Sequence, residues 1–201
     1  VNLYYMKYKD QLVLTGKIND VGAYTRTNIP KSYRAGVELQ GTYVAAKWVN
    51  VAANIALSKN KIKNFTEYLD DYGQQTNFYA STDIAFSPNV VAGGSINFTP
   101  VKNAEINLMS KYVGRQYLDN TSLKSRSLNP YYTQDVRLSY LLKGKVFKAT
   151  DIILQLNNIF SKKYAPNGYS FSYIYGGSLT TENYYFPMAP FNCMVGVNIR
   201  L

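Results

Sequence analysis

Eight segments of the chain are candidate β-strands, and in seven of them apolar and polar residues alternate at every second position; in the first, Tyr and Met fall on both sides. Strand side chains point alternately to opposite faces, so this period predicts β-strands with one apolar and one polar face. In the last segment, residues 191–201, the two faces separate as follows. Val195, Val197, Ile199 and Leu201 fall on one side, and Met194, Gly196, Asn198 and Arg200 fall on the other. The eight segments are residues 2–8, with residues 12–14 as a candidate continuation, 33–45, 49–58, 89–99, 105–115, 135–142, 152–157 and 191–201.

The second segment indicates the thickness of the apolar band. Tyr33 and Tyr43 lie ten positions apart on its apolar side. At roughly 3.3 Å per residue and a tilt near 45°, they are separated by about 23 Å along a membrane normal. Outer-membrane barrels have an apolar band of about 25 Å bordered by aromatic rings. The pattern therefore predicts an all-β, antiparallel transmembrane β-barrel.

The connections between these segments alternate in length. The long ones are residues 15–32, 59–88, 119–130 and 161–190, and the short ones are residues 46–48, 100–103 and 143–150. Membrane barrels have short periplasmic turns and long outer loops. The long connections, centred near Val21, Asp71, Ser125 and Gly176, are therefore predicted to face the outside of the cell.

Composition narrows the function classes. Tyr supplies 20 residues and Phe 9, as interfacial aromatic girdles require. With one Cys and no His, the chain has no disulfide framework and lacks the commonest metal ligand and general base, so we expect no catalytic site, metal or cofactor. The formal charge of +10 is scattered, which argues against nucleic acid and supports at most a preference for anionic ligands or lipopolysaccharide.

Four phrases in the sequence resemble those of TonB-dependent outer-membrane receptors. They are NLYYMKYKDQLV (residues 2–13), NIPKSYRAGVEL (28–39), KYVGRQYLDNT (111–121) and LNNIFSKKY (156–164). The first resembles a strand that precedes an outer loop, and the second resembles a segment that re-enters the barrel. Their order and spacing, which follow those of the family, cover nearly the whole chain.

The resemblance implies a 22-stranded barrel whose lumen is filled by a plug domain. Residues 1–201 would supply the last eight strands, as the C-terminal part of a larger protein, with the plug outside this chain. The implied activity is import of a large nutrient complex such as a ferric siderophore, energised through TonB. The implied location is the outer membrane, where lipid surrounds the barrel.

Several charged residues fall on the polar side of the predicted strands and are candidates for a ligand path through the lumen. They are Arg34, Glu38, Lys111, Arg115, Asp135, Arg137 and Arg200. They would contact the plug and an anionic or iron-chelate ligand. The alternative is a set of inward ion pairs that fills and hydrates the barrel.

The last long connection is rich in aromatic residues. Its candidates for stacking on a planar or catecholate ligand are Tyr164, Tyr169, Tyr173, Tyr175, Tyr184 and Tyr185. Packing within the loop or a girdle role is the alternative. Asn157 and Asn158 are predicted to cap a strand beside a turn.

Two other functions remain open from the sequence. The first is a self-contained eight-stranded outer-membrane barrel with an adhesive or structural role, in which the first strand pairs with the last. The second is a soluble β-barrel that binds a ligand, in which Val37, Leu39, Ile106 and Leu154 point inward.

Overall fold

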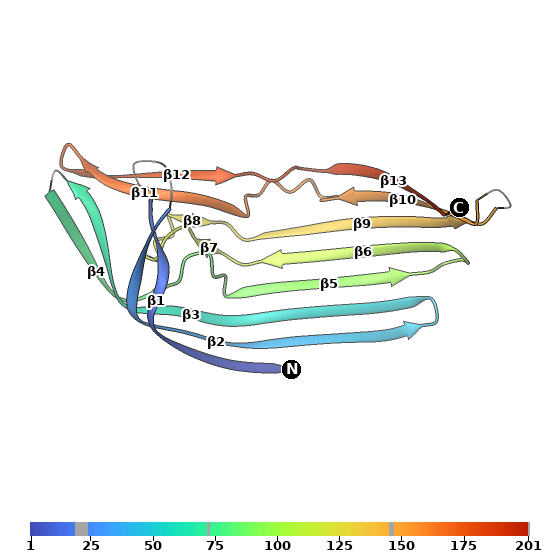
Figure 1. Cartoon of the computed structure of the whole chain (residues 1–201), viewed down its shortest axis with the longest axis horizontal. Helices are drawn as coiled ribbons and strands as arrows, with labels where there is room; N and C mark the ends of the chain where they lie inside the picture. The colour runs from blue at the N-terminus through green and yellow to red at the C-terminus, as the bar shows by residue number, and fades with distance from the viewer. Residues whose placement is uncertain (19–23, 72, 145–146, 201) are drawn as a thin grey trace.

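The structure, a computed structural model, describes residues 1–18, 24–71, 73–144 and 147–200. It is built from antiparallel strand pairs, with one parallel bridge between Tyr173 and Asp70 (Figure 1). The strands are β1 (Asn2–Ile18), β2 (Tyr24–Ala46), β3 (Val49–Asp71), β4 (Gly73–Asp83), β5 (Val90–Phe98), β6 (Ala104–Val113), β7 (Gln116–Tyr117), β8 (Ser127–Leu128), β9 (Tyr131–Leu142), β10 (Ala149–Asn157), β11 (Asn167–Tyr175), β12 (Ser178–Phe186) and β13 (Asn192–Arg200). Within the described residues, no helix is long and apolar enough to cross a membrane.

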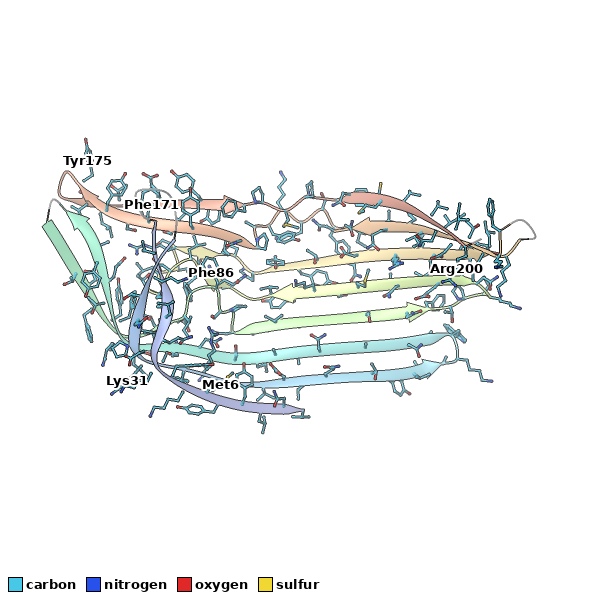
Figure 2. All side chains as sticks on the ribbon, in the orientation of Figure 1. Met6, Lys31, Phe86, Phe171, Tyr175 and Arg200 are labelled. Atoms are coloured by element: carbon cyan, nitrogen blue, oxygen red, sulfur yellow. The ribbon has the colours of Figure 1, made fainter. Side chains whose placement is uncertain are left out.

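Eight of these strands form one continuous wall in the order β1-β2-β3-β5-β6-β9-β10-β13. Each overlaps one of the eight predicted segments, although β5, β6 and β13 are shorter than predicted, and this confirms the prediction of an antiparallel all-β fold. The short turns lie at one end of the wall, and the long connections lie at the other (Figure 1). Arg200 lies at the short-turn end, and Lys31 lies toward the long connections (Figure 2).

Three of the predicted long loops are instead largely strand. In the first connection, 15–32, β1 and β2 continue as one hairpin, although the part around Val21 lies outside the described residues. The second, 59–88, contains the upper half of β3 and all of β4. The fourth, 161–190, contains the β11–β12 hairpin. Outside the lipid these hairpins need no continuous apolar face, so the apolar pattern used to find wall strands does not reveal them.

The pairing register places the predicted faces in line across the wall. Leu3 lies opposite Val37, and Val37 lies opposite Leu57. On the far side, Ile152 lies between Tyr140 and Val197. We call a row of paired residues that crosses the wall a rung, and polar rungs alternate with the apolar ones. One polar rung contains Asn50, Asn97, Asn107 and Arg137, on β3, β5, β6 and β9. The chain therefore has one apolar and one polar sheet face; the side of Leu201 lies outside the described residues.

The wall is open at both edges, which overturns the self-contained eight-stranded barrel. Within the described residues, β1 pairs with β2 alone, and β13 pairs with β10 alone. Each edge strand therefore leaves one row of backbone groups without a sheet partner. Lipid provides no hydrogen bonds, so a membrane barrel must pair such rows. The wall is an arc that needs further strands to close.

The alternative of a soluble, ligand-binding β-barrel is also wrong. Val37, Leu39, Ile106 and Leu154 lie on the face opposite the charged rungs. Apolar residues of that face are extensively exposed, with Val195 at 73% and Leu39 at 43%. An exposed apolar surface of this extent is stable against lipid rather than water.

Beyond the wall, the outer hairpins bury apolar residues in the ordinary way. Val13, Ile29, Ile62, Phe65 and Ile84 form a small core between the β1–β2 and β3–β4 hairpins. Ile62 has no exposed surface, whereas Leu57, five residues earlier on the same strand, is 45% exposed. The two residues lie on opposite faces of β3, so Leu57 is on the apolar side of the wall and Ile62 packs into this core on the other side.

Candidate functional site

The predicted lumen residues line separate hollows on the polar face of the wall. A hollow of about 450 Å³ near the outer end is lined by Arg34 and Glu38. Lys111 borders a second hollow of about 490 Å³ in the middle of the wall. Arg137 and Arg200 line a third, of about 770 Å³, at the short-turn end. The charged candidates are therefore spread along the length of the wall.

These lumen candidates do not form the ion-pair network that the sequence left open. None of the seven forms an ion pair within the part of the chain that the structure describes. Arg34 instead donates hydrogen bonds of 3.0 Å to Asn60 and to Ser87. Glu38 accepts a bond of 3.0 Å from Asn2. Their charges therefore face the hollow with neutral partners.

The hollow at the short-turn end has a mixed charge. Arg137 and Arg200 share it with Glu105 and Asp151, and Lys102 lies at its border. Arg200 reaches it from β13, which joins the wall beside β10. Two carboxylates and three cationic groups facing one space can bind a polar protein surface through several charge-assisted hydrogen bonds.

Two of the lumen candidates, Arg115 and Asp135, make structural contacts instead. Arg115 was predicted to point inward from a strand, but β6 ends at Val113, and Arg115 donates a bond of 2.8 Å to Ser127 in the outer connection. Asp135 does lie on the polar face, opposite Met109, but its carboxylate accepts the backbone N–H of Asn158 at 2.7 Å. Asp135 therefore anchors a strand end.

Asn158 has the predicted capping role at the end of β10. Its φ of 48° lies in the left-handed region, which Asn tolerates better than most residues. The side chain accepts from the N–H of Lys162 at 3.0 Å and donates to the carbonyls of Lys162 at 2.9 Å and Ala189 at 3.3 Å. The cap ties together both ends of the last outer connection.

The β11–β12 hairpin gathers aromatic rings on one of its faces. Tyr169 and Tyr184 are cross-strand partners whose rings stack at 4.8 Å with an interplanar angle of 10°. Phe171 stacks on Tyr184 at 6.1 Å and on Tyr173 at 6.0 Å. We call Tyr169, Phe171, Tyr173 and Tyr184 the aromatic face. Such a row of nearly parallel rings is suited to stacking on a flat aromatic ligand.

The other tyrosine candidates lie elsewhere. Tyr175 is on the same side of the hairpin by register, at the tip, and is 71% exposed (Figure 2). Tyr185 points to the opposite side of β12 from Tyr184. Tyr164 stacks on Tyr131 at 4.3 Å, where β9 begins, and burial raises the pKa of the Tyr164 phenol. Tyr164 therefore packs against the loop base, as the alternative interpretation proposed.

Glu182 lies within the aromatic face and fixes two of its rings. The hydroxyls of Tyr184 and Tyr173 donate to its carboxylate at 2.6 and 2.8 Å. These bonds hold the pKa of Glu182 below its ordinary value, and they raise the pKa of both tyrosines. The ring positions are thus set by a charged carboxylate at neutral pH.

A buried ionic cluster, absent from the sequence predictions, joins the outer segments. Arg126, which is 2% exposed, forms ion pairs with Glu67 of β3 and, at 3.0 Å, with Asp119. Tyr79 of β4 donates to the same Glu67 at 3.0 Å. Burial lowers the pKa of Arg126, but the bond to Glu67 and the charge of Asp119 outweigh it and raise the pKa overall. The guanidinium therefore stays charged and links the β3–β4 hairpin to the 118–128 connection.

One sequence signal pointed to this cluster. Asp119 accepts from the N–H and the hydroxyl of Thr121 at 3.0 and 2.6 Å, and Asn120 accepts from the N–H of Ala85 at 2.8 Å. These residues belong to the phrase YLDNT, which carried part of the family resemblance. The phrase indicated a conformation of the chain, but its charge partner Glu67 is distant in sequence.

The described residues contain no group of three or more His, Cys, Asp or Glu side chains placed to hold a metal ion. The geometry therefore offers two features for a ligand: charged hollows on the polar face and aromatic rings above them.

The family model described as "TonB dependent receptor-like, beta-barrel" matches residues 1–159. The chain belongs to this family. It is therefore part of an outer-membrane β-barrel, and the polar face of its wall is the lumen face. The family consists of receptors and transporters, which agrees with the prediction that the chain is not an enzyme. No curated protein matches the chain in sequence.

Solved receptor structures share this fold. The siderophore receptor PiuA from Acinetobacter baumannii matches 98% of the chain with a TM-score of 0.70 at 16% identity. The ferric-catecholate import receptor Fiu from E. coli matches 98% with a TM-score of 0.64 at 16% identity. The ferric yersiniabactin uptake receptor FyuA from Yersinia pestis matches 97% with a TM-score of 0.59 at 21% identity. The match covers 25%, 24% and 26% of these proteins, so the chain spans about a quarter of their length.

Proposed function

We propose that the chain is the C-terminal part of the barrel of a TonB-dependent importer of a large nutrient complex, with a ferric siderophore as its substrate. The open edges of the wall support a larger barrel, since β1 and β13 each need a further partner strand. In this proposal the same protein carries a plug domain outside residues 1–201, and the full barrel has 22 strands.

The aromatic face is the observation that carries the choice of substrate. Its stacked rings offer parallel π surfaces at the outer end of the barrel, where a ligand arrives first. A catecholate siderophore presents flat aromatic rings and negative charge. The rings suit the aromatic face, and the charge suits Arg34 and Lys111 on the lumen face below. Three of the solved structures similar to this chain are named as receptors for siderophores or for their iron complexes.

The hollow at the short-turn end supports the proposed plug contact. Arg137, Arg200, Glu105 and Asp151 surround it at the periplasmic end of the lumen. A plug that is moved by TonB must bind the wall through contacts that can break and re-form. Hydrated charge pairs serve this better than a dry apolar interface, because water replaces their hydrogen bonds when they separate.

The test is iron uptake from a radiolabelled ferric tris-catecholate by cells that express the complete protein. We expect deletion of TonB to abolish uptake. We expect Tyr184→Ala to raise the half-saturating concentration about tenfold, since ring stacking contributes about 0.5–1.5 kcal/mol beyond its buried area. Tyr185→Ala is the matched control: the two tyrosines are neighbours with 43% and 47% exposure, but they lie on opposite faces of the hairpin.

Two outcomes contradict different parts of the proposal. Uptake that persists without TonB would exclude an energised importer. Equal effects of Tyr184→Ala and Tyr185→Ala, with TonB dependence intact, would exclude the aromatic face as the ligand contact while leaving the transport function standing.

A further inference from the structure

Six lysines form a ladder across the outward face of β1, β2 and β3. They are Lys7, Lys9, Lys31, Lys59, Lys61 and Lys63. Lys9 pairs with Lys31, and Lys31 pairs with Lys63, which places three lysines on one rung. On the next rung Tyr33 lies between Lys7 and Lys61, and on the rung below it Ala35 lies between Tyr5 and Lys59. We call this set the lysine ladder.

The lysine ladder lies on the lipid-facing side. Its register continues directly into the rung of Leu3, Val37 and Leu57 on the apolar face. Just past the top rung, Asp10 and Asn64 have φ values of 53° and 56°, which interrupt the regular geometry of β1 and β3. Lys31 lies where the wall meets the outer hairpins (Figure 2). The ladder therefore occupies the outer rim of the membrane-spanning wall.

Its depth matches that of lipid headgroups. The rings of Tyr5 and Tyr33 stack at 5.9 Å. On this face, Tyr33 lies one rung below the rung of Lys9, Lys31 and Lys63, and Tyr5 lies two rungs below it. Aromatic rings form such a girdle at the membrane interface. Lys31 is two residues beyond Tyr33, which is about 5 Å farther along the membrane normal at a tilt of 45°. Interfacial tyrosine rings sit at the level of the lipid headgroups, so lysines about 5 Å from them are within the headgroup region.

The ladder carries an excess of uncompensated charge. Asp83 pairs with Lys61 at 2.9 Å. The other five lysines are exposed and form no ion pair with any residue that the structure describes. Like charges directly opposite each other destabilise a sheet, and neighbouring strands are only about 4.8 Å apart. An anion bound across the top rung would remove this repulsion.

We propose that the lysine ladder binds the phosphate groups of outer-leaflet lipid, the diphosphorylated lipid A anchor of lipopolysaccharide. The phosphates bridge Lys9, Lys31 and Lys63, and the acyl chains lie against the apolar rungs of Leu3 and Leu57 below. A soluble anion would match only the positive charge of this surface. The lipid matches both its charge and its apolar continuation.

The test is a titration of the complete protein, in a neutral maltoside detergent, with purified lipid A, followed by native mass spectrometry. In the triple variant Lys9→Gln, Lys31→Gln, Lys63→Gln we expect the affinity to fall roughly a hundredfold, or about fivefold for each lysine. The matched control removes the same charge from exposed turn residues at the opposite end of the wall, through Lys47→Gln, Lys143→Gln and Lys148→Gln. We expect less than a twofold change there.

Further arms distinguish the source of the phosphate. Dephosphorylated lipid A should bind the native protein as weakly as lipid A binds the triple variant. Inorganic phosphate that competes with lipid A at equal concentration would overturn the assignment to a lipid, and an equal loss in the control variant would overturn the assignment to the ladder. Should the triple variant fail to fold, Lys31→Gln alone must still weaken binding about fivefold; an unchanged affinity would overturn the proposal.

Discussion

Arg126 shows how one side chain supports the outer part of the molecule. It is nearly fully buried and forms ion pairs with Glu67 and Asp119, which are 9% and 5% exposed. A buried ion pair contributes little net stability, because desolvation offsets the attraction. Removing one partner is costly, however, because it leaves the other charge buried without compensation.

We therefore expect Arg126→Met to destabilise the outer segments by about 3–5 kcal/mol. The local readout is hydrogen exchange of the Leu118 amide, which donates to the carbonyl of Arg126 at 2.9 Å. This amide should exchange a hundredfold faster or more. Arg115→Met is the control: Arg115 donates to the neutral side chains of Ser127 and Asn129, so its loss leaves no buried charge unpaired and should cost less, about 1.5–3 kcal/mol. Similar exchange rates in the two variants would refute a structural role for the ionic cluster.

The β3–β4 hairpin illustrates stability at the scale of an element. It leaves the wall at its outer end, and the core of Ile62 and Phe65 holds it to the β1–β2 hairpin. The bond from Tyr79 to Glu67 adds a titratable contact. Burial and then the charge of Glu67 raise the pKa of Tyr79 from 10.0 to about 12.

This pKa predicts a specific response to alkaline pH. The phenol is protonated more readily in the folded state, so its contribution to stability is fully present below pH 10 and is lost as the pH rises through about 12. We expect a difference titration of tyrosinate absorbance, native protein minus Tyr79→Phe, to show one group titrating at about 12. A difference centred at 10 would mean that Tyr79 is neither buried nor in contact with Glu67 in solution.

The whole molecule is organised by two solvents. The wall exposes its apolar face to lipid and its polar face to the lumen, while the outer hairpins bury Val13, Ile29 and Ile62 as a soluble protein does. The lysine ladder and the Tyr5–Tyr33 stack lie at the boundary between these regions. Each segment is thus stable only in its own surroundings.

Neighbouring positions on β10 test this division. Leu154 lies in line with Leu138 and Val195 on the apolar face, and Gln155 lies in line with Arg137 on the lumen face. Both are partly exposed and lie near the middle of the strand. In a bilayer we expect Leu154→Arg to lower the free energy of unfolding by about 2–4 kcal/mol, and Gln155→Arg to change it by less than about 1 kcal/mol. Urea titrations in liposomes measure both, and a larger loss for Gln155→Arg would mean that the faces are reversed.

For the candidate residues on the wall, the sequence predicted the face on which each side chain lies but not the contacts that it makes. Alternation correctly placed Arg34, Glu38 and Arg137 on the polar side, because the face of a strand residue depends only on its parity. Asp135 had the correct face too, yet its carboxylate caps Asn158, a partner 23 positions away. Tyr184 and Tyr185 were equivalent candidates until the pairing of β11 with β12 put them on opposite sides.

The sequence by itself determined the eight wall strands and their two faces, because lipid on one side imposes a period-two pattern that is local and visible residue by residue. The tertiary structure decided the outer hairpins, the Arg126 cluster, the lysine ladder and the open edges. Each of these depends on which strands are neighbours and in which register, and pairs such as Glu67 with Arg126 or Lys9 with Lys31 and Lys63 come from separate segments. Register is set by the sum of all cross-strand contacts, so no single segment contains it.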